Sequence, residues 1–508
     1  MSQHPAVQDG HQLARGAAAN ALVLVAANFR GVFTFLIARL LGQAALGRFG
    51  LVFTVTDLLS KPATLGFEEG MVPLVASRVA VGDGTGARHV YRRGLTAALV
   101  ASATLAAIGW PFLEWLAGAR GLEAFGGGAA IMLLALPGIT LARISTAASR
   151  ALLAMRNEFY SRGLVETWVT TAVFVVAIAL GVRGMAPSLA VVAGASAGGV
   201  VAWLLARRVL ARVPGDQPAH RHSTWSAVRF SAPIAGSGLL TVLMLNIDVL
   251  ILGAYVGRVP GVTVEAFGAF CAAAEIAGGM RKVRQVFDPI FAPVAATRAA
   301  APDATALRHT VESPGRWMLA AQLPLVGVLV LASGTVMSIY GSSFREGARW
   351  LALLAIAHGS NSFAGLVETL MMVKRPSLNL ANALVTVALQ AIASVILIPR
   401  IGVTGAALAM CIGFAAQGVI RFAEVRHVFG WSWPWHSLKR PLAAFLVAMA
   451  PAVAVRLAGG IWSEVAAAVV FAALYIGAWK WMGADPADRE IWRRLKSRSP
   501  HGAVQEVA

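Results

Sequence analysis

Apolar residues recur along this chain in long blocks, and short polar segments separate the blocks. The blocks are about 20 to 28 residues long, which is the length that a helix needs to cross about 30 Å of hydrocarbon. A helix satisfies its backbone hydrogen bonds internally, so this pattern predicts an all-α membrane protein. Placing the blocks by hydropathy gives about fourteen transmembrane helices. They are expected at residues 17–41, 46–80, 92–117, 127–154, 158–182, 187–211, 225–256, 263–299, 314–340, 344–373, 377–398, 403–428, 437–457 and 461–483.

The order of these helices predicts two similar halves and an additional helix pair. A shift of about 218 to 220 residues aligns MVPLVASR at 71–78 with FAPVAATR at 291–298, which indicates an internal repeat. About six helices per copy give both copies the same orientation, so a pseudo-twofold axis along the membrane normal is expected to relate two six-helix lobes. The expected parts are a cytoplasmic segment 1–16, an N-terminal lobe 17–212, a cytoplasmic linker 213–224, a C-terminal lobe 225–428, a helix pair within 429–483 and a basic cytoplasmic tail 484–508.

The composition of the chain is that of a membrane protein. The sequence is 57% hydrophobic and 13% charged, with a mean hydropathy of +0.69, which is too apolar for a soluble core of ordinary size. The net charge is +19, and the basic residues concentrate in alternate loops, as the positive-inside rule expects. We therefore expect both termini in the cytoplasm, no cleaved signal peptide and no nucleic-acid partner.

The motifs in the chain do not indicate an enzyme. It contains no Walker A sequence, no H-E-x-x-H and no cluster of cysteine and histidine with metal-ligand spacing. Residues 194–198 spell G-x-S-x-G, but inside an expected transmembrane helix small residues at this spacing favour helix packing over a hydrolase nucleophile. We expect a protein that is not an enzyme and that uses no cofactor or metal.

Two segments resemble a known family. Residues 37–78 read IARLLGQAALGRFGLVFTVTDLLSKPATLGFEEGMVPLVASR, with a short turn at 41–47 and a break at Leu65-Gly66. They look like the opening of the polysaccharide-biosynthesis flippases in the multidrug/oligosaccharidyl-lipid/polysaccharide (MOP) exporter superfamily. IGVTGAA at 401–407 is similar to a second segment of that family. The resemblance covers the first twelve expected helices and implies a V-shaped, MATE/MOP-like transporter with a central cavity between two lobes.

The resemblance also implies a substrate and a location. Such flippases carry undecaprenyl-pyrophosphate-linked oligosaccharide repeat units across the bacterial inner membrane for O-antigen of lipopolysaccharide, capsule or exopolysaccharide. The implied partners are the polyprenyl-pyrophosphate-linked glycan, the lipid bilayer, a coupling ion (H⁺ or Na⁺) and a polysaccharide polymerase complex.

Several charged residues lie at expected membrane depth, where each costs about 2.5 to 3.5 kcal/mol unless it faces protein or water. Arginine presents a planar fork of donors that suits a diphosphate. We expect a cationic cavity lined by Arg30, Lys61, Arg143, Arg150 and Arg281. The carboxylates expected to pair with these cations, to couple movement to an ion or to act in gating are Asp57, Asp248, Glu275 and Glu368. A simple intrahelical ion pair between Asp57 and Lys61, spaced i and i+4, is the competing explanation.

Bends are expected inside the helices at Pro62 and Pro289 and at Gly66. Proline removes a backbone donor and kinks a helix. Each bend is a candidate hinge of alternating access, and a fixed packing kink is the alternative.

Three other functions fit parts of the pattern. The first is a cation-coupled exporter of small amphipathic molecules, including drugs, which an acidic and aromatic lumen would favour. The second is a lipid II-type flippase, although the Ser-Arg-Leu-Gly-Arg-Asp opening associated with that group is not seen around Arg30. The third belongs to a different class, the membrane glycosyltransferases and ligases. These enzymes commonly carry catalytic residues in a large external loop, whereas the expected external loops are short.

Overall fold

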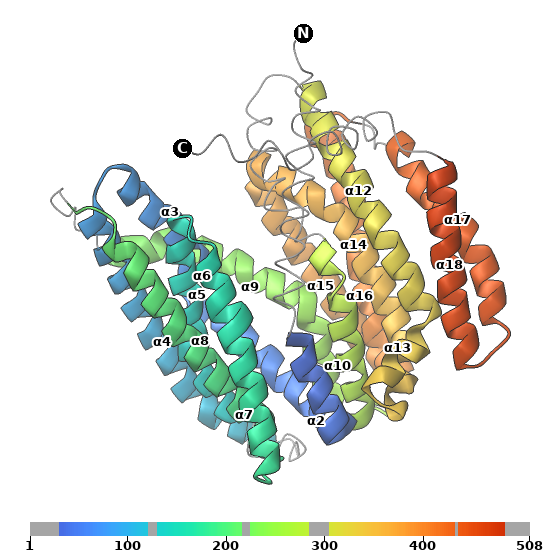
Figure 1. Ribbon diagram of the computed structural model, residues 1–508, viewed down its shortest axis with the longest axis horizontal. Coiled ribbons are helices and arrows are strands. Elements are labelled where there is room, and N and C mark those ends of the chain that lie inside the picture. The colour runs from blue at the N-terminus through green and yellow to red at the C-terminus, as the bar shows by residue number, and fades with distance from the viewer. Residues whose placement is uncertain (1–29, 120–129, 216–223, 284–303, 432–434, 483–508) are drawn as a thin grey trace, which may run out of the picture. The chain divides into compact units, whose positions relative to one another are not determined.

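The computed structural model describes residues 30–119, 130–215, 224–283, 304–431 and 435–482 (Figure 1). Within these ranges the chain is helical and contains no β-strand. The helices group into two compact units, one with the described residues up to Cys271 and the other with those from Ala272 onward. The all-α fold expected from the hydropathy pattern is confirmed.

The first unit begins with the end of the first expected helix. Its elements are α2 (Arg30–Ala63), α3 (Phe67–Ala80), α4 (Gly84–Ala119), η2 (Ala130–Leu134), α5 (Ala135–Ala151), α6 (Arg156–Glu158), η3 (Phe159–Glu166), α7 (Thr167–Ala179), α8 (Ala186–Ala211), α9 (Thr224–Tyr255) and the first half of α10 (Val264–Gly278). A kink at Gly42, where φ is 82°, joins the first two expected helices within α2. Glycine suits this position because it adopts positive φ without steric cost. Helices α4, α5, α7 and α8 lie side by side (Figure 1).

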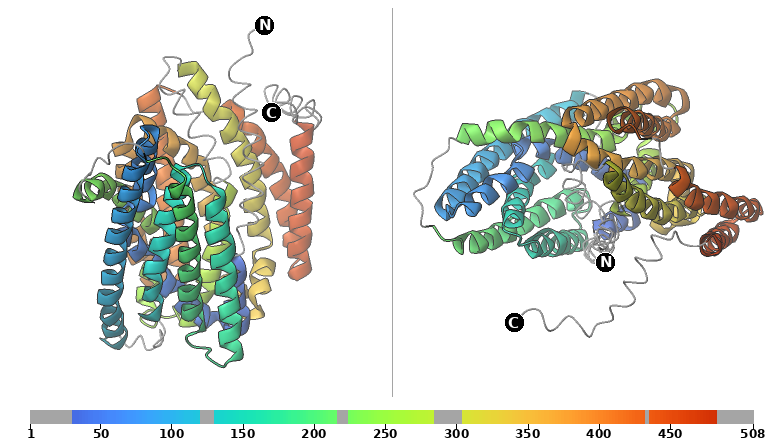
Figure 2. Two further views of the ribbon diagram at one scale, coloured as in Figure 1. Left: turned by 60° about the vertical axis from the view of Figure 1, so that its left-hand side comes forward. Right: turned by 90° about the horizontal axis from the view of Figure 1, so that it is seen from above.

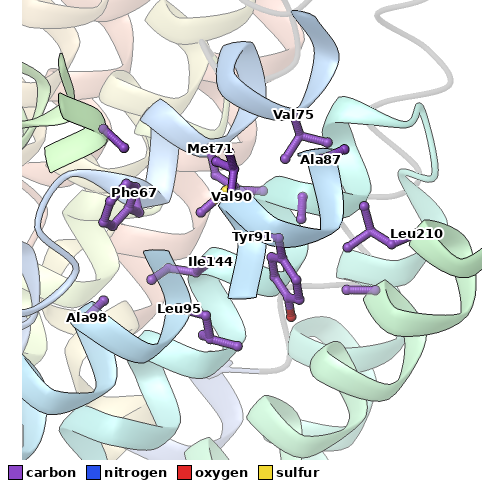
Figure 3. Packing of buried hydrophobic residues seen from close by; sticks show 14 residues of the cluster. Phe67, Met71, Val75, Ala87, Val90, Tyr91, Leu95, Ala98, Ile144 and Leu210 are labelled. Carbon is purple, nitrogen blue, oxygen red and sulfur yellow. The ribbon is translucent and has the colours of Figure 1, made fainter. Parts of the chain in front are cut away.

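Buried apolar side chains of α3, α4, α5, α8 and α9 form the main core of the first unit (Figure 3). Phe67 and Met71 of α3 pack with Val90 of α4 and Ile144 of α5. Within the same core, the hydroxyl groups of Tyr91 and of a serine on α5 lie 2.8 Å apart. Lipid tails are as apolar as these side chains, so the helices associate through close packing and such interhelical hydrogen bonds.

Helix α8 is held between two neighbours by small residues. A Cβ at Gly138 of α5 would lie 2.8 Å from the backbone of α8, and one at Gly199 of α8 would lie 2.7 Å from the Gly138 carbonyl oxygen. On the other side, a Cβ at Gly198 would lie 2.8 Å from the Cβ of Glu166 in η3. The glycines of the G-x-S-x-G segment therefore lie at a close helix contact, and Ser196 between them is exposed.

The second expected helix breaks between α2 and α3. Leu65 has a φ of 51° and Gly66 a φ of 78°, so two successive residues adopt the left-handed region. A side chain at Gly66 would overlap the carbonyl oxygen of Ser231 in α9, and one at Gly70 would overlap the Ser231 hydroxyl. The bend expected near Gly66 is present, and its close packing against α9 leaves no room for a side chain at positions 66 and 70.

The second unit contains the remaining helices. They are the end of α10, α12 (Ala304–Leu331), α13 (Ser333–Tyr340), η4 (Ser342–Gly347), α14 (Ala348–Lys374), α15 (Pro376–Ile401), α16 (Val403–Phe429), α17 (Trp435–Arg456) and α18 (Ile461–Trp481). Helices α17 and α18 lie side by side in both views of Figure 2 and pack on α12. The Tyr475 hydroxyl donates to the Ala320 carbonyl at 3.1 Å, and Phe471 is buried against the same helix.

One buried carboxylate anchors this helix pair to the rest of the second unit. The Glu464 side chain, 8% exposed, lies in the first turn of α18. It accepts hydrogen bonds from the backbone nitrogen and the hydroxyl of Thr335 at 2.6 and 2.9 Å. Arg345 donates to it at 2.8 Å, and Arg456 of α17 lies 3.6 Å away. A carboxylate with this many donors is satisfied despite its burial.

Ten helices among the described residues are long and apolar enough to cross a membrane, or eleven if one bent pair is counted as a single span. That pair is α12 and α13, which meet at 76° in the segment expected as one helix at 314–340. The expected count of about fourteen stays a prediction. The first expected helix lies mostly outside the described residues, and the eighth extends into the undescribed range 284–303.

Candidate functional site

Five elements of the first unit bring together a network of charged side chains. The network starts where α2 breaks into α3, crosses the middle of α5 and continues into α6 and η3. All of these elements belong to candidate membrane spans, 31–80, 130–151 and 156–179. Its basic members are Lys61, Arg143, Arg150 and Arg162, and its acidic members are Asp57, Glu68, Glu158 and Glu166.

Arg143 of α5 is the buried centre of the network, with a side chain that is only 9% exposed. Its two terminal nitrogens bind different carboxylates, that of Asp57 at 2.7 Å and that of Glu68 at 3.2 Å. Lys61 donates to the same oxygen of Glu68 at 2.8 Å. A buried arginine is tolerated only when its charge is compensated in this way, because removing either partner leaves a desolvated charge.

The helix break explains how Lys61 and Glu68 meet. They are separated by seven residues, and the left-handed turn at Leu65 and Gly66 lies between them. The Glu68 carbonyl oxygen, in the first turn of α3 just after this turn, accepts a hydrogen bond from Arg150 at 3.0 Å. The bend therefore positions both the carboxylate and the backbone acceptor of Glu68 for two arginines of α5.

The second half of the network lies at the hairpin that joins α5 to α6. Glu158 interacts with Arg162 at 3.2 Å and with Arg150 at 3.8 Å, and Arg162 lies 3.9 Å from Glu166. These four side chains are 34% to 36% exposed, whereas Arg143 is 9% exposed. The network therefore runs from a buried centre to a part that is about a third exposed.

Element η3 is a π-helix of eight residues, and it carries Arg162 and Glu166. Segments of π-helix are rare and occur frequently at functional sites. Ser161 is completely buried and donates to the Asn157 carbonyl at 2.7 Å, while a Cβ at Gly198 of α8 would lie 3.1 Å from the Ser161 carbonyl oxygen. Close contact with α8 thus holds the π-helical segment in place.

The structure brings four of the expected site residues together, namely Lys61, Arg143, Arg150 and Asp57. They lie in a network whose formal charges cancel, because four carboxylates accompany the four basic groups. Asp57 and Lys61 are each bound to a residue beyond their own helical turn, Arg143 and Glu68 respectively. The expectation that these cations line a transport path stays a prediction.

The other expected site residues lie elsewhere. Arg30 is the first residue of α2, and its side chain lies outside the described part of the chain. Asp248 of α9 is 1% exposed, and Glu275 of α10 is exposed. Arg281 and Glu368 are half-buried in the second unit. The ion pairs that form the network do not include these five residues.

Four members of the network were not among the expected site residues, namely Glu68, Glu158, Arg162 and Glu166. The spacing of Glu158, Arg162 and Glu166, four residues apart each time, is a signal that the sequence does contain. Glu68 gave no comparable signal, because its partners lie seven and 75 residues away in the chain. Among the described residues, no group of histidine, cysteine, aspartate and glutamate is suited to hold a metal ion.

Comparison with known proteins identifies relatives of both the sequence and the fold. The model of a family described as "Polysaccharide biosynthesis protein" matches residues 13–280. No curated protein matches the chain.

Among solved structures, an inward-facing multidrug resistance MATE family transporter of the MOP superfamily superposes with a TM-score of 0.69 at 15% identity, over 82% of this chain and 98% of the other. The lipid II flippase MurJ, in an inward closed conformation, superposes with a TM-score of 0.67 at 12% identity, over 94% of this chain and 100% of the other. A MOP superfamily transporter from Pyrococcus furiosus, whose binding pocket is described as having reverse polarity, gives 0.63 at 15% identity, over 85% and 99%. These similarities establish a MATE/MOP-like fold.

Proposed function

Because the chain belongs to the polysaccharide biosynthesis protein family, we propose that it is a flippase for undecaprenyl-pyrophosphate-linked oligosaccharide in the bacterial inner membrane. Its fold is that of membrane transporters and flippases, and it is a multi-pass membrane protein. The oligosaccharide repeat unit would be carried to the periplasmic leaflet by alternating access and used there for envelope polysaccharide.

The charged network of the first unit is the observation that best supports this proposal. A helical bundle that only had to fold in lipid would avoid four basic and four acidic side chains within its spans, because charges at membrane depth are costly. A lipid diphosphate brings negative charge into the same low-dielectric region, and arginine is the side chain best suited to bind it there. Here Arg150 and Arg162 are each about a third exposed and lie within such spans.

The buried half of the network has a different role in this proposal. Arg143 and Lys61 are held by Asp57 and Glu68, so they keep the helices of the first unit together around a charged interior. Asp57 is 29% exposed and is the carboxylate of this group that a proton or sodium ion would reach. Protonation or ion binding at Asp57 would weaken its ion pair with Arg143. Binding of the ion would in this way loosen the contact between α2 and α5.

The remaining expected residues complete the proposal. Arg30 and Arg281 would add positive charge along the substrate path. Asp248, Glu275 and Glu368 would serve in ion coupling or gating. A polysaccharide polymerase would take up the product on the periplasmic side.

A lipid II-type flippase is the second candidate, because the similarity to MurJ covers 94% of this chain. Lipid II-type and oligosaccharide flippases share a diphosphate-linked lipid and differ in the sugar. The family match favours the polysaccharide substrate.

The proposal is tested in a strain of the source bacterium that lacks this gene. We expect surface polysaccharide to be lost and diphosphate-linked oligosaccharide to accumulate on the cytoplasmic leaflet, with wild-type protein restoring both. The Arg92→Ala variant should restore both as well as wild type does, because Arg92 is an exposed arginine of α4 outside the network. Normal polysaccharide combined with hypersensitivity to drugs would instead indicate a small-molecule exporter. A defect confined to peptidoglycan would indicate the lipid II-type function.

A further inference from the structure

The hairpin between α5 and α6 places two arginines on either side of one carboxylate. The two oxygens of Glu158 face different guanidinium groups, that of Arg162 at 3.2 Å and that of Arg150 at 3.8 Å. We propose that Arg150 and Arg162 form the site that first receives the diphosphate of the lipid-linked substrate, and that Glu158 occupies this site until the substrate displaces it. This inference rests on the proposed function and names the residues that recognise its anionic group.

Exposure separates these two arginines from the other basic residues of the network. Arg150 and Arg162 have side chains that are 34% and 36% exposed. Arg143 is 9% exposed and Lys61 is 18% exposed, and both bind carboxylates at short distance. A diphosphate can therefore contact Arg150 and Arg162 without opening the core of the unit, whereas Arg143 is buried and already binds two carboxylates.

The position of the two arginines along their helices suits a lipid headgroup. Arg150 precedes the last residue of α5, and Arg162 lies six residues after the start of α6, about 9 Å along the helix. Arg143 lies seven residues before Arg150, about 10 Å further along α5. The diphosphate of a membrane lipid lies at the interface, so it meets Arg150, at the end of α5, before it meets Arg143.

The hairpin is built to hold the two arginines in place before the ligand arrives. Asn157 donates to the Ser149 hydroxyl at 3.1 Å, and the Ala154 nitrogen donates to the Ser149 carbonyl at 2.9 Å. Leu153 in the turn has a φ of 58°, which is uncommon for a residue with a branched side chain. A turn held in this conformation reduces the entropy that ligand binding would otherwise cost.

Charge favours exchange of the carboxylate for a diphosphate. Glu158 brings one negative charge to two guanidinium groups, and its 3.8 Å separation from Arg150 is too long for a hydrogen bond. A diphosphate brings at least two negative charges and enough oxygens to accept from both arginines in the bidentate manner that phosphate allows. Glu158 is itself 35% exposed, so it can turn toward water when the diphosphate enters.

The test measures binding to the purified full-length protein in nanodiscs. The probes are undecaprenyl diphosphate, undecaprenyl monophosphate and inorganic pyrophosphate, with binding followed by native mass spectrometry and by thermophoresis. We expect Arg150→Ala and Arg162→Ala each to weaken binding of undecaprenyl diphosphate by about tenfold to a hundredfold. Arg92→Ala removes the same charge outside the network and should bind like wild type.

Glu158→Gln distinguishes a ligand site from a structural ion pair. If Glu158 competes with the substrate, removing its charge should tighten binding of the diphosphate several-fold. If the three residues only stabilise the hairpin, Glu158→Gln should weaken binding together with the arginine variants, and this result would overturn the inference. Thermal unfolding of every variant, with Arg150→Lys and Arg162→Lys as conservative substitutions, separates loss of folding from loss of binding.

The outcomes also separate this site from the function on which it rests. Binding of undecaprenyl diphosphate by wild type with no effect of either arginine substitution would overturn the site and leave the proposed function standing. Failure of wild type to bind undecaprenyl diphosphate would overturn both. Equally tight binding of inorganic pyrophosphate would assign the site to a free anion in place of a lipid headgroup, and this would contradict the lipid-linked ligand.

Discussion

Replacing Arg143 by methionine tests whether the buried network stabilises the first unit. The substitution keeps an unbranched side chain of similar length and removes both ion pairs of Arg143. Breaking a buried ion pair by removing one partner costs about 3 to 5 kcal/mol. Glu68 keeps its contact with Lys61 at 2.8 Å, and Asp57 is 29% exposed, so water compensates part of the loss. We therefore expect a loss of about 3 kcal/mol in the free energy of unfolding, at the lower end of that range.

The assay is reversible unfolding in mixed micelles of detergent and sodium dodecyl sulfate, followed by tryptophan fluorescence. A double-mutant cycle with Asp57→Asn isolates the pair itself, and a coupling free energy of about 1 to 2 kcal/mol is expected. Asp57→Asn alone should cost less than Arg143→Met, because Arg143 retains Glu68 at 3.2 Å. A coupling near zero, or an unfolding free energy of Arg143→Met within about 0.5 kcal/mol of wild type, would refute this explanation of the network.

Three further predictions concern other parts of the fold. Glu464→Ala should lower the unfolding free energy of the second unit by about 3 kcal/mol, and limited proteolysis should then release α17 and α18; wild-type resistance would contradict the anchor. Gly66→Ala should reduce folded protein strongly, because its Cβ meets Ser231. Gly82→Ala is its control, since Gly82 has a similar positive φ but open space, and should cost only about 1 kcal/mol; equal yields would argue against the close contact. Gly198→Leu should disturb the contact of α8 with η3 and lower the melting temperature by several degrees in a fluorescence-based thermal assay. An unchanged melting temperature would show that this contact accommodates a large side chain.

Helix positions were largely predictable from hydropathy. The helix expected at 187–211 is observed as α8, Ala186–Ala211, and the one expected at 403–428 as α16, Val403–Phe429. The thickness of the hydrocarbon core sets the length of a spanning helix, so the length of an apolar block predicts where the helix begins and ends. The 76° bend between α12 and α13 was not predictable, because no proline or charge separates the two helices at residues 331–333.

The charged network was predictable only in part. Charge at membrane depth identified Lys61, Arg143 and Arg150 as residues with a role beyond lipid contact. Their partners depend on three-dimensional packing, because Glu68 reaches Arg143 only through the left-handed turn at Gly66. A sequence pattern reveals which charges must be compensated, and the fold decides which groups compensate them.

Transport by the purified protein tests the central claim most directly. Proteoliposomes would carry a fluorescent oligosaccharide linked by a diphosphate to undecaprenol, and a membrane-impermeant quencher would report which leaflet holds it. We expect wild-type protein to move the lipid between leaflets, Arg162→Ala to slow this movement by about tenfold or more, and Arg92→Ala to match wild type. If the lipid stayed in its original leaflet with wild-type protein, while a small amphipathic dye was exported under an ion gradient, the flippase proposal would be contradicted.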